Sequence, residues 1–298
     1  MKYLPGCLLL FLSALSAAAD PAPAPRLLVV ISVDQMRADT LTRFAAEYTS
    51  GLDRFLEHGR RFDGRLDHAG TETGPGHSTM LTGCRPSRTG IVANGWLDRA
   101  TLRRIYCVDD PASPVYGAPR SGRSPKNLLR NTLGDWMKRA DPRAKVYSVS
   151  AKDRAAILMA GRYPDGVFWL DKRRPGFTTS RYYRPAGLPD WLIAFNHDGW
   201  FAALPASWTY KAVPGLRADD DPRESPRYGR VSPHPLLHSK VAETIGALYH
   251  SPFVDAWTLR LAARVVDRYD LGGDATCDLL CVSLSATDTV GHLYGPFS

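Results

Sequence analysis

Short apolar runs alternate along the chain with segments in which apolar residues recur at helical spacing. The runs typical of buried strands span residues 26–33, 61–68, 145–150, 166–171 and 278–283. Helical spacing extends over residues 40–55, 127–139, 153–160, 188–195 and 253–269, and residues 78–83 suit a short helix. Because strands and helices alternate, the pattern predicts an α/β fold with a mostly parallel central sheet flanked by helices.

The segment before the first predicted strand has the features of a secretory signal peptide. Lys2 supplies a positive charge, Leu8–Leu15 form a short apolar run, and Ala17–Ala19 offer a small-residue cleavage site. The apolar run is too short to span a membrane. We therefore expect residues 1–19 to be a signal peptide, residues 20–26 to be a linker, and the protein to be exported to the periplasm or secreted.

Composition and charge exclude several classes of protein. The 298 residues are 44% hydrophobic and 23% charged, which is ordinary for a globular protein and excludes a disordered or collagen-like chain. The formal charge is +8, but the basic residues are scattered, so we expect no nucleic-acid partner. A mild positive field still favours anionic substrates. No Cys-x-x-Cys pair is present, so a thiolate zinc site is not expected.

Residue types that bind metals follow the first and the last predicted strands. Asp34 comes directly after the first, and Asp288 and His292 come shortly after the last. Ligands of open α/β sheets bind at the carboxyl ends of the strands, and carboxylate with imidazole suits Zn²⁺. The spacing of Asp288 and His292 puts both on one face of a helix. Alone these features are weak, because Asp34 taken by itself favours a helix cap over a metal ligand.

A glycine-rich turn places a threonine hydroxyl at a predicted helix start. Residues 71–77 read TETGPGH and precede the short helix of residues 78–83. The partial positive charge of a helix N-terminus, about half a unit, stabilises an alkoxide or a bound phosphate. The alternative is that Thr71 or Thr73 only caps the helix. We expect His77 to make a hydrogen bond at the helix start rather than to bind a metal.

Six segments occur in the order found in the alkaline phosphatase superfamily, and together they resemble its bacterial PafA-type branch. They are SVDQMRAD (32–39), TETGPGH (71–77), IVANGW (91–96), SAKDRAAI (150–157), GVFWLD (166–171) and SATDTVGHLYGP (285–296). The likeness extends from about Leu27 to Ser298. It implies an alkaline phosphatase-like α/β/α fold and hydrolysis of small phosphorylated substrates.

The resemblance also implies two zinc ions and a phosphothreonine intermediate. Asp34 would ligate one zinc ion, and Thr73 would be the nucleophile bound to it. Asp288 and His292 would ligate the other. Two zinc ions can stabilise both the attacking and the leaving oxygen of a phosphate ester.

Three further residues match the substrate contacts of this family. By the resemblance, Asn94 would donate a hydrogen bond to a phosphoryl oxygen, and Lys152 and Arg154 would bind the remaining oxygens. Arginine offers a planar fork for two oxygens, whereas lysine acts as a point charge. The Lys-x-Arg pair favours phosphate monoesters over diesters, because a monoester carries one more charged oxygen.

The chain departs from the family pattern at its C-terminus. Members of the family continue well beyond the position of Ser298, where they supply an Asp-His pair and a late His for the zinc ions. The upstream Asp67-His68 is expected to be a strand-end pair. We therefore expect residues 27–298 to be the N-terminal part of a catalytic domain, with an insert or cap at about 160–235. Each zinc ion would keep two protein ligands, so we expect weak zinc binding and little activity from the chain alone.

Three other functions are compatible with parts of the sequence. Nucleotide pyrophosphatases and phosphodiesterases of the same superfamily resemble the chain less at the Lys-x-Arg element. A sulfatase would use Cys84, since residues 84–88 match Cys-x-Pro-x-Arg, but the family's nucleophile position falls at Thr73. A non-catalytic exported protein that binds anions is the third alternative, motivated by the missing ligands.

Overall fold

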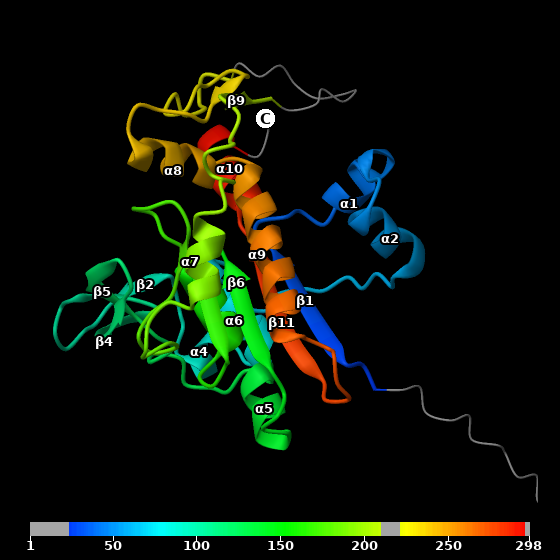
Figure 1. Cartoon of the computed structure of the whole chain (residues 1–298), viewed down its shortest axis with the longest axis vertical. Coiled ribbons are helices and arrows are strands. Elements are labelled where there is room, and N and C mark those ends of the chain that lie inside the picture. Colours follow the sequence, from blue (N-terminus) through cyan, green and yellow to red (C-terminus); the bar gives the residue numbers. More distant parts are fainter. Residues whose placement is uncertain (1–23, 210–220, 296–298) are drawn as a thin grey trace, which may run out of the picture.

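A five-stranded sheet forms the centre of the computed structural model, which describes residues 24–209 and 221–295 (Figure 1). The strand order is β1 (Leu27–Val33), β11 (Asp278–Leu284), β6 (Val146–Ser150), β7 (Gly166–Leu170), β8 (Phe177–Thr178). Neighbouring strands are parallel except β8, which runs antiparallel to β7. The predicted α/β fold is confirmed. The predicted signal peptide and most of the linker lie outside the described residues.

Helices and short hairpins surround this sheet. The helices are α1 (Thr40–Arg43), α2 (Gly51–His58), α3 (Thr73–Thr82), α4 (Pro86–Thr89), α5 (Leu133–Ala140), α6 (Asp153–Ala160), α7 (Asp190–Asn196), α8 (Val241–Tyr249), α9 (Phe253–Tyr269) and α10 (Ala286–Tyr294), with a 3₁₀ turn at Ala45–Glu47. The hairpin strands are β2 (Gly95–Leu97), β3 (Arg104–Tyr106), β4 (Asp109–Val115), β5 (Ala118–Arg123), β9 (Ser207–Trp208) and β10 (His234–Pro235). In the part of the chain that the structure describes, no helix is long and apolar enough to span a membrane.

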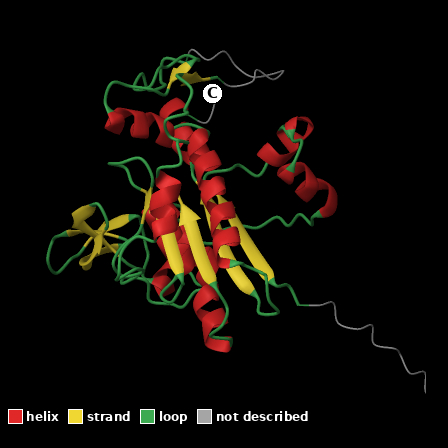
Figure 2. Ribbon diagram, viewed as in Figure 1, coloured by secondary structure: helices red, strands yellow, loops and turns green. Residues whose placement is uncertain are grey.

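Successive residues of the central strands face two different helix layers. Val149 and Val282 belong to one apolar cluster with Trp257 of α9. Val167 belongs to another with Ile157 of α6, and α3 packs against α6 on that side. Because side chains alternate along a strand, burial of both faces produces the continuous apolar runs seen in the sequence. Figure 2 shows these helices on the two faces of the central strands, whereas β1, at the edge of the sheet, is largely exposed.

Several expected elements differ from those observed. Residues 61–68 form no strand, so that prediction is wrong and Asp67-His68 is not a strand-end pair. In place of one helix over 40–55 the chain forms α1, the 3₁₀ turn and α2, because Tyr48 has extended backbone angles. The helix expected at 127–139 begins at Leu133. The two hairpins β2–β3 and β4–β5 and the helix α8 were not predicted.

A reciprocal cap explains where α5 begins. The Thr132 hydroxyl accepts a hydrogen bond from the Asp135 backbone N–H (3.3 Å), and the Asp135 carboxylate accepts one from the Thr132 backbone N–H (2.9 Å). This capping box provides hydrogen-bond acceptors for backbone N–H groups at the helix start, which have no acceptor within the helix itself. Upstream, Asn127 instead donates its side-chain amide to the Cys107 carbonyl (3.2 Å), which ties that segment to a different part of the chain.

The segment expected as an insert or cap, 160–235, contributes to two structures. Its first part supplies β7 and β8 to the central sheet. Its last described part packs with α8 and α10, where Tyr228 and Leu236 form an apolar cluster with Ala247 and Leu293. Figure 1 shows β9 and α8 beside α10, past the carboxyl ends of the strands.

Candidate active site

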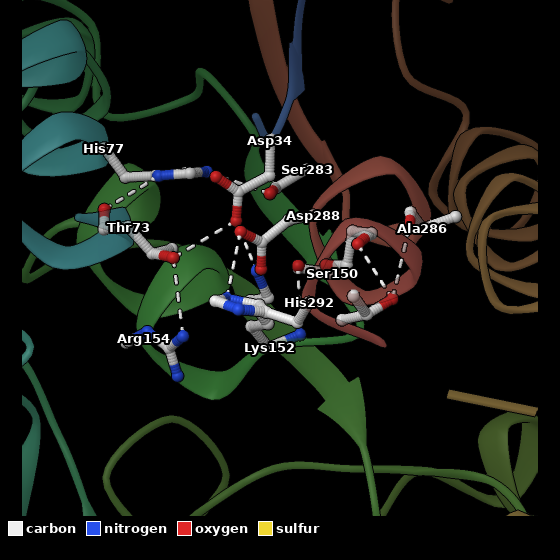
Figure 3. Close-up of polar contacts among 12 residues, drawn as sticks. Asp34, Thr73, His77, Ser150, Lys152, Arg154, Ser283, Ala286, Asp288 and His292 are labelled. Atoms are coloured by element: carbon white, nitrogen blue, oxygen red, sulfur yellow. Dashed lines mark hydrogen bonds and ion pairs between the residues drawn. The ribbon is translucent and has the colours of Figure 1, made fainter. Parts of the chain in front are cut away.

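Side chains from four distant segments meet at the carboxyl end of the sheet (Figure 3). Asp34 follows β1, Lys152 follows β6, Asp288 lies in α10 after β11, and Thr73 is the first residue of α3. The backbone N–H of Asp34 donates to the Leu284 carbonyl at 3.0 Å, which extends the β1–β11 pairing by one residue. The sheet therefore fixes the distance between the two predicted metal-binding carboxylates.

Lys152 is the cation between these two carboxylates. Its ammonium donates hydrogen bonds to Oδ2 of Asp34 and to Oδ2 of Asp288. The lysine side chain is 1% exposed, so water screens the interaction little. Burial alone would raise the pKa of Asp34, but the charge and hydrogen bond of Lys152 outweigh it and hold that pKa below its ordinary value of 3.8. The expected contact of Lys152 with a phosphoryl oxygen stays a prediction, and in this structure the ammonium contacts the two carboxylates.

Thr73 lies within hydrogen-bond reach of a carboxylate and a guanidinium. Its Oγ1 donates to Oδ2 of Asp34 at 3.1 Å and accepts from Nη2 of Arg154 at 3.4 Å. The residue is buried at the N-terminus of α3, where the helix dipole favours negative charge on this oxygen. The hydroxyl predicted from the TETGPGH turn is therefore next to both Asp34 and Arg154.

Asn94 holds the start of α3. Its Oδ1 accepts a hydrogen bond from the Gly74 backbone N–H at 2.7 Å, and its own N–H donates to the Glu72 carboxylate. A Cβ on residue 74 would lie 3.1 Å from Asn94 Oδ1 and 3.3 Å from the Cys107 sulfur, so a glycine is needed for this approach. Because Oδ1 already accepts this hydrogen bond, the side-chain NH₂ of Asn94 is the group that remains to donate one to a ligand.

A partly buried network orients Arg154. Its Nη1 donates to the Tyr106 hydroxyl at 3.4 Å, and that hydroxyl donates to Asp153 at 2.6 Å. Asp153 also accepts from Arg123 at 2.7 Å. Nε of Arg154 is buried and has no hydrogen-bond partner among the described residues. The sequence did not single out Tyr106, Asp153 or Arg123, although Asp153 lies inside the SAKDRAAI segment.

His77 has a structural role, as expected. Its Nδ1 contacts the Thr73 carbonyl at 2.8 Å and its Nε2 contacts the Ser283 hydroxyl at 2.9 Å. Burial lowers the pKa of His77, so the ring is neutral, with a proton on Nδ1 for the carbonyl. Both ring nitrogens are used, and the ring joins α3 to β11.

Asp288 and His292 lie one turn apart on α10. His292 Nε2 is 3.4 Å from Asp288 Oδ1, and the imidazole is largely exposed. Asp255 of α9 positions this helix, because its carboxylate accepts hydrogen bonds from the backbone N–H groups of Ser285 (2.6 Å) and Ala286 (3.0 Å). Burial raises the pKa of Asp255 to about 6 despite these bonds. Nothing in the sequence indicated this long-range cap.

Replacing Asp255 by alanine should destabilise the protein by about 1–2 kcal/mol, because the first N–H groups of α10 lose their acceptor. Asp255→Asn keeps an acceptor and should cost less. Because burial raises the pKa of Asp255, the stability that this residue contributes falls as the pH rises from about 4 to about 6. Asp255→Asn should show no such fall. Urea unfolding measures these differences. Asp267→Ala, on an exposed position of α9, is the control, and a loss as large there would contradict the capping role.

Comparison with known proteins assigns the family. A sequence model of type I phosphodiesterase / nucleotide pyrophosphatase matches residues 28–298. The chain belongs to the type I phosphodiesterase / nucleotide pyrophosphatase family. The match includes all the residues described above at the carboxyl end of the sheet, and the predicted relationship to the alkaline phosphatase superfamily is confirmed.

Several relatives within this family are alkaline phosphatases. Alkaline phosphatase PhoK of Sphingomonas sp is 38% identical over 293 residues, which are 95% of this chain and 49% of that protein. Alkaline phosphatase PafA of Elizabethkingia meningoseptica is 33% identical over 297 residues, 94% of this chain and 54% of that protein. The chain thus spans about half the length of the curated relatives it matches.

Solved structures show the same fold. The crystal structure of wild type PafA superimposes with a TM-score of 0.86 at 34% identity, over 94% of this chain and 56% of that chain. A PafA variant with one threonine, one asparagine, one lysine and one arginine substituted gives a TM-score of 0.87 at 32% identity, over the same shares of the two chains. The alkaline phosphatase-like fold of this family member is therefore shown.

The donor chemistry at the carboxyl end of the sheet fits a metal centre. Asp34 with Thr73 and Asp288 with His292 form two donor pairs of the carboxylate, hydroxyl and imidazole types that bind zinc. The ammonium of Lys152 shows that the space between the carboxylates accommodates a cation. In residues 24–209 and 221–295, no group of three or more His, Cys, Asp or Glu side chains is placed to hold a metal ion.

Cys84 lies far from this centre. It follows Gly83, the C-terminal cap of α3, whereas Thr73 begins the helix. Ten helical residues separate two points by about 15 Å. The cysteine of a sulfatase motif would need to lie beside Asp34 and Arg154, where the hydroxyl of Thr73 lies. Among the described residues the cysteines are all free thiols: Cys84, Cys107, Cys277 and Cys281.

Proposed function

We propose that this chain carries catalytic residues of a zinc-dependent alkaline phosphatase that hydrolyses phosphate monoesters through a phosphothreonine at Thr73. The observation that carries the proposal is the position of Thr73 Oγ1, between Asp34 and Arg154 at the start of α3. The alkaline phosphatase relatives support the reaction class.

The nucleophilic step follows from the contacts of Thr73. Its hydroxyl proton points toward Asp34 Oδ2, which leaves the oxygen lone pairs directed away from the carboxylate. Attack forms the Oγ1–P bond and breaks the bond from phosphorus to the alcohol oxygen; the hydroxyl proton of Thr73 is lost to solvent, and the alcohol oxygen takes up a proton from solvent as it leaves. Water then cleaves the phosphothreonine and restores the hydroxyl. Positioning and charge stabilisation dominate catalysis of such transfers.

Asn94 and Arg154 are the proposed contacts for the transferred phosphoryl group. The Asn94 NH₂ and the unpaired Nε of Arg154 are donors beside Thr73 that the described chain does not satisfy fully. Lys152 is the third proposed contact. Its ammonium becomes available to a phosphoryl oxygen only when other cations neutralise Asp34 and Asp288.

Asp34 and Thr73 would hold one zinc ion, and Asp288 and His292 would hold the other. When bound, zinc would stabilise negative charge on the attacking and leaving oxygens. The PafA variant supports the assignment of the remaining residues, because its four substituted residue types are those of Thr73, Asn94, Lys152 and Arg154.

Arg154→Met tests whether monoesters are the substrates. Turnover, here and in the experiments below, is to be measured on a chain extended to the length of its relatives. The variant should lose about tenfold or more in kcat/KM for p-nitrophenyl phosphate with zinc present, because a charge-assisted contact to a phosphoryl oxygen is removed. The loss for bis-p-nitrophenyl phosphate should be smaller, since a diester lacks one charged oxygen. Arg143→Met, on an exposed arginine paired with Asp141, is the control.

Each result of this experiment bears on the proposal. Equal losses on both esters would favour the phosphodiesterase alternative. Phosphate binding without turnover of either ester would favour the non-catalytic anion-binding protein. Turnover unaffected by a chelator would contradict the role of zinc.

We also propose that the protein is exported, on the basis of residues 1–19. A mature N-terminus at Asp20 in the periplasmic or secreted fraction is the expected finding, and an intact Met1 in the cytoplasm would contradict it.

A further inference from the structure

A hollow of about 660 Å³ lies beside α8, outside the candidate active site. We call it the α8 pocket. Its polar and aromatic lining consists of Lys172, Arg227, Tyr228, His238, Tyr249 and His250.

Two residues connect the α8 pocket to the candidate active site. Lys172, which follows β7, lines the pocket and also a second hollow of about 260 Å³ that includes Arg154 and Asp153. Tyr249 is buried at the end of α8. Burial raises the pKa of Tyr249, Arg154 opposes this shift and Asp153 adds to it, so the phenol is within electrostatic reach of the active-site charges. A ligand could therefore extend from Arg154 past Lys172 into the pocket.

The pocket has an excess of positive charge. Lys172 and Arg227 are exposed, and neither forms an ion pair with a carboxylate of the described chain. Each lies against a tyrosine ring, with Lys172 Nζ 4.1 Å from the Tyr249 centroid and Arg227 Cζ 5.2 Å from the Tyr228 centroid. Cations held on aromatic faces remain available to an anion. Glu243 is the carboxylate that lines the α8 pocket. Its Oε1 forms an ion pair with Lys240 Nζ at 3.3 Å.

Two histidines add donors with unused nitrogens. His238 Nε2 is buried and has no hydrogen-bond partner among the described residues. His250 directs Nδ1 to the Gly246 carbonyl at 2.7 Å, which leaves Nε2 to meet a ligand. The Tyr228 ring lies between them, 5.7 Å from the His238 ring and 5.6 Å from the His250 ring. A buried nitrogen without a partner is costly unless a ligand or water satisfies it.

We propose that the α8 pocket binds a second anionic group, carried on the alcohol part of the substrate. The proposal rests on the function proposed above and specifies its substrate class: phosphate monoesters of alcohols that bear a further carboxylate or phosphate. Lys172 and Arg227 bind that group, and the rings of Tyr228 and Tyr249 contact the organic body that joins it to the reacting phosphate. Such a contact adds binding free energy at a distance from the reacting phosphorus.

A matched pair of esters tests this assignment. Phenyl phosphate and 4-carboxyphenyl phosphate differ only by a carboxylate opposite the ester oxygen. With zinc present, the protein should have a KM about tenfold lower for the carboxylated ester, the effect of a partly exposed charge-assisted contact. Arg227→Met and Lys172→Met should each reduce the ratio of the two KM values toward one. Arg139→Met, which removes an exposed charge on α5, should leave the ratio as it is in the wild type.

A second measurement does not depend on turnover. Benzoate should shift the ¹⁵N ring resonances of His238 and His250 in the wild type, and the shifts should be lost in Arg227→Met. Shifts with benzoate in a chain that is extended to the length of its relatives and still turns over neither ester would support the pocket and refute the proposed phosphatase function. Turnover of both esters with equal KM values, or ring resonances insensitive to benzoate, would overturn the pocket proposal and leave the phosphatase function standing.

Discussion

Thr73→Ala is expected to abolish the phosphoenzyme and to lower kcat for p-nitrophenyl phosphate by about 10³-fold or more. Removing Oγ1 removes the atom that would bond to phosphorus, and no other described hydroxyl lies between Asp34 and Arg154 in this way. Thr73→Ser keeps the oxygen and should retain part of the activity. Acid quenching with radiolabelled phosphate, followed by mapping of the labelled peptide, measures the intermediate directly.

Thr79→Ala is a matched control for this experiment. Thr79 lies on the same helix, α3, and its hydroxyl has no hydrogen-bond partner in the described part of the chain. The variant should be labelled and turned over like the wild type. Label that persists in Thr73→Ala on another residue would refute the proposed nucleophile.

Lys152→Met is expected to have the largest effect on stability. In the metal-free protein it would leave Asp34 and Asp288 close together at the end of the sheet without the ammonium that neutralises them. Removing one partner of a buried ion pair costs about 3–5 kcal/mol. Urea unfolding at pH 8 with a chelator measures this loss. Zinc should stabilise the variant more than the wild type, because in the variant zinc does not have to displace the Lys152 ammonium from the two carboxylates.

The effect of Lys152→Met should depend on pH in a defined direction. Burial acts to raise the pKa of Asp34, but Lys152 overcomes it and keeps the folded-state value below 3.8. Asp34 therefore contributes stability above about pH 4 that is lost as the pH falls through its lowered pKa. The difference between wild type and variant should shrink in acid, where the carboxylates of the variant are protonated.

Lys138→Met provides the comparison for this prediction. Lys138 Nζ is 2.7 Å from Asp165 Oδ1, but both side chains are partly exposed, so the expected loss is about 1 kcal/mol or less. A loss as large as that of Lys152→Met would show that burial of the Asp34–Lys152–Asp288 group has no special effect.

The residues that follow the strands were the part of the site that the sequence predicted most directly. Asp34 and Asp288 follow continuous apolar runs, and parallel strands bring their carboxyl ends to the same edge. The strand predicted at 61–68 was wrong because its alternating residues have no neighbouring strand to pair with, and Phe62 is left exposed. The pattern of apolar residues indicates the local secondary structure, but it does not show which strand another strand pairs with.

Contacts between distant polar residues were not predictable from patterns. Tyr106 reaches Asp153 across 47 positions, and Asp255 reaches Ser285 across 30. Neither pair has a local signature, because their proximity depends on how hairpins and helices pack. The ion pairs of Lys152 with Asp34 and Asp288 were not predicted for a similar reason. The resemblance indicates a substrate contact, whereas the nearest unsatisfied charges in this structure are the carboxylates of Asp34 and Asp288.

The pairing of β1 with β11 has a consequence for how the molecule assembles. Leu27 lies opposite Asp278, so these strands join almost the two ends of the described chain. Closing so long a loop is entropically unfavourable and slow, so we expect this register to form late in folding, once the intervening strands are in place. Because Asp34 and Asp288 follow these same two strands, a metal cation bound there would report that the first and last strands have docked.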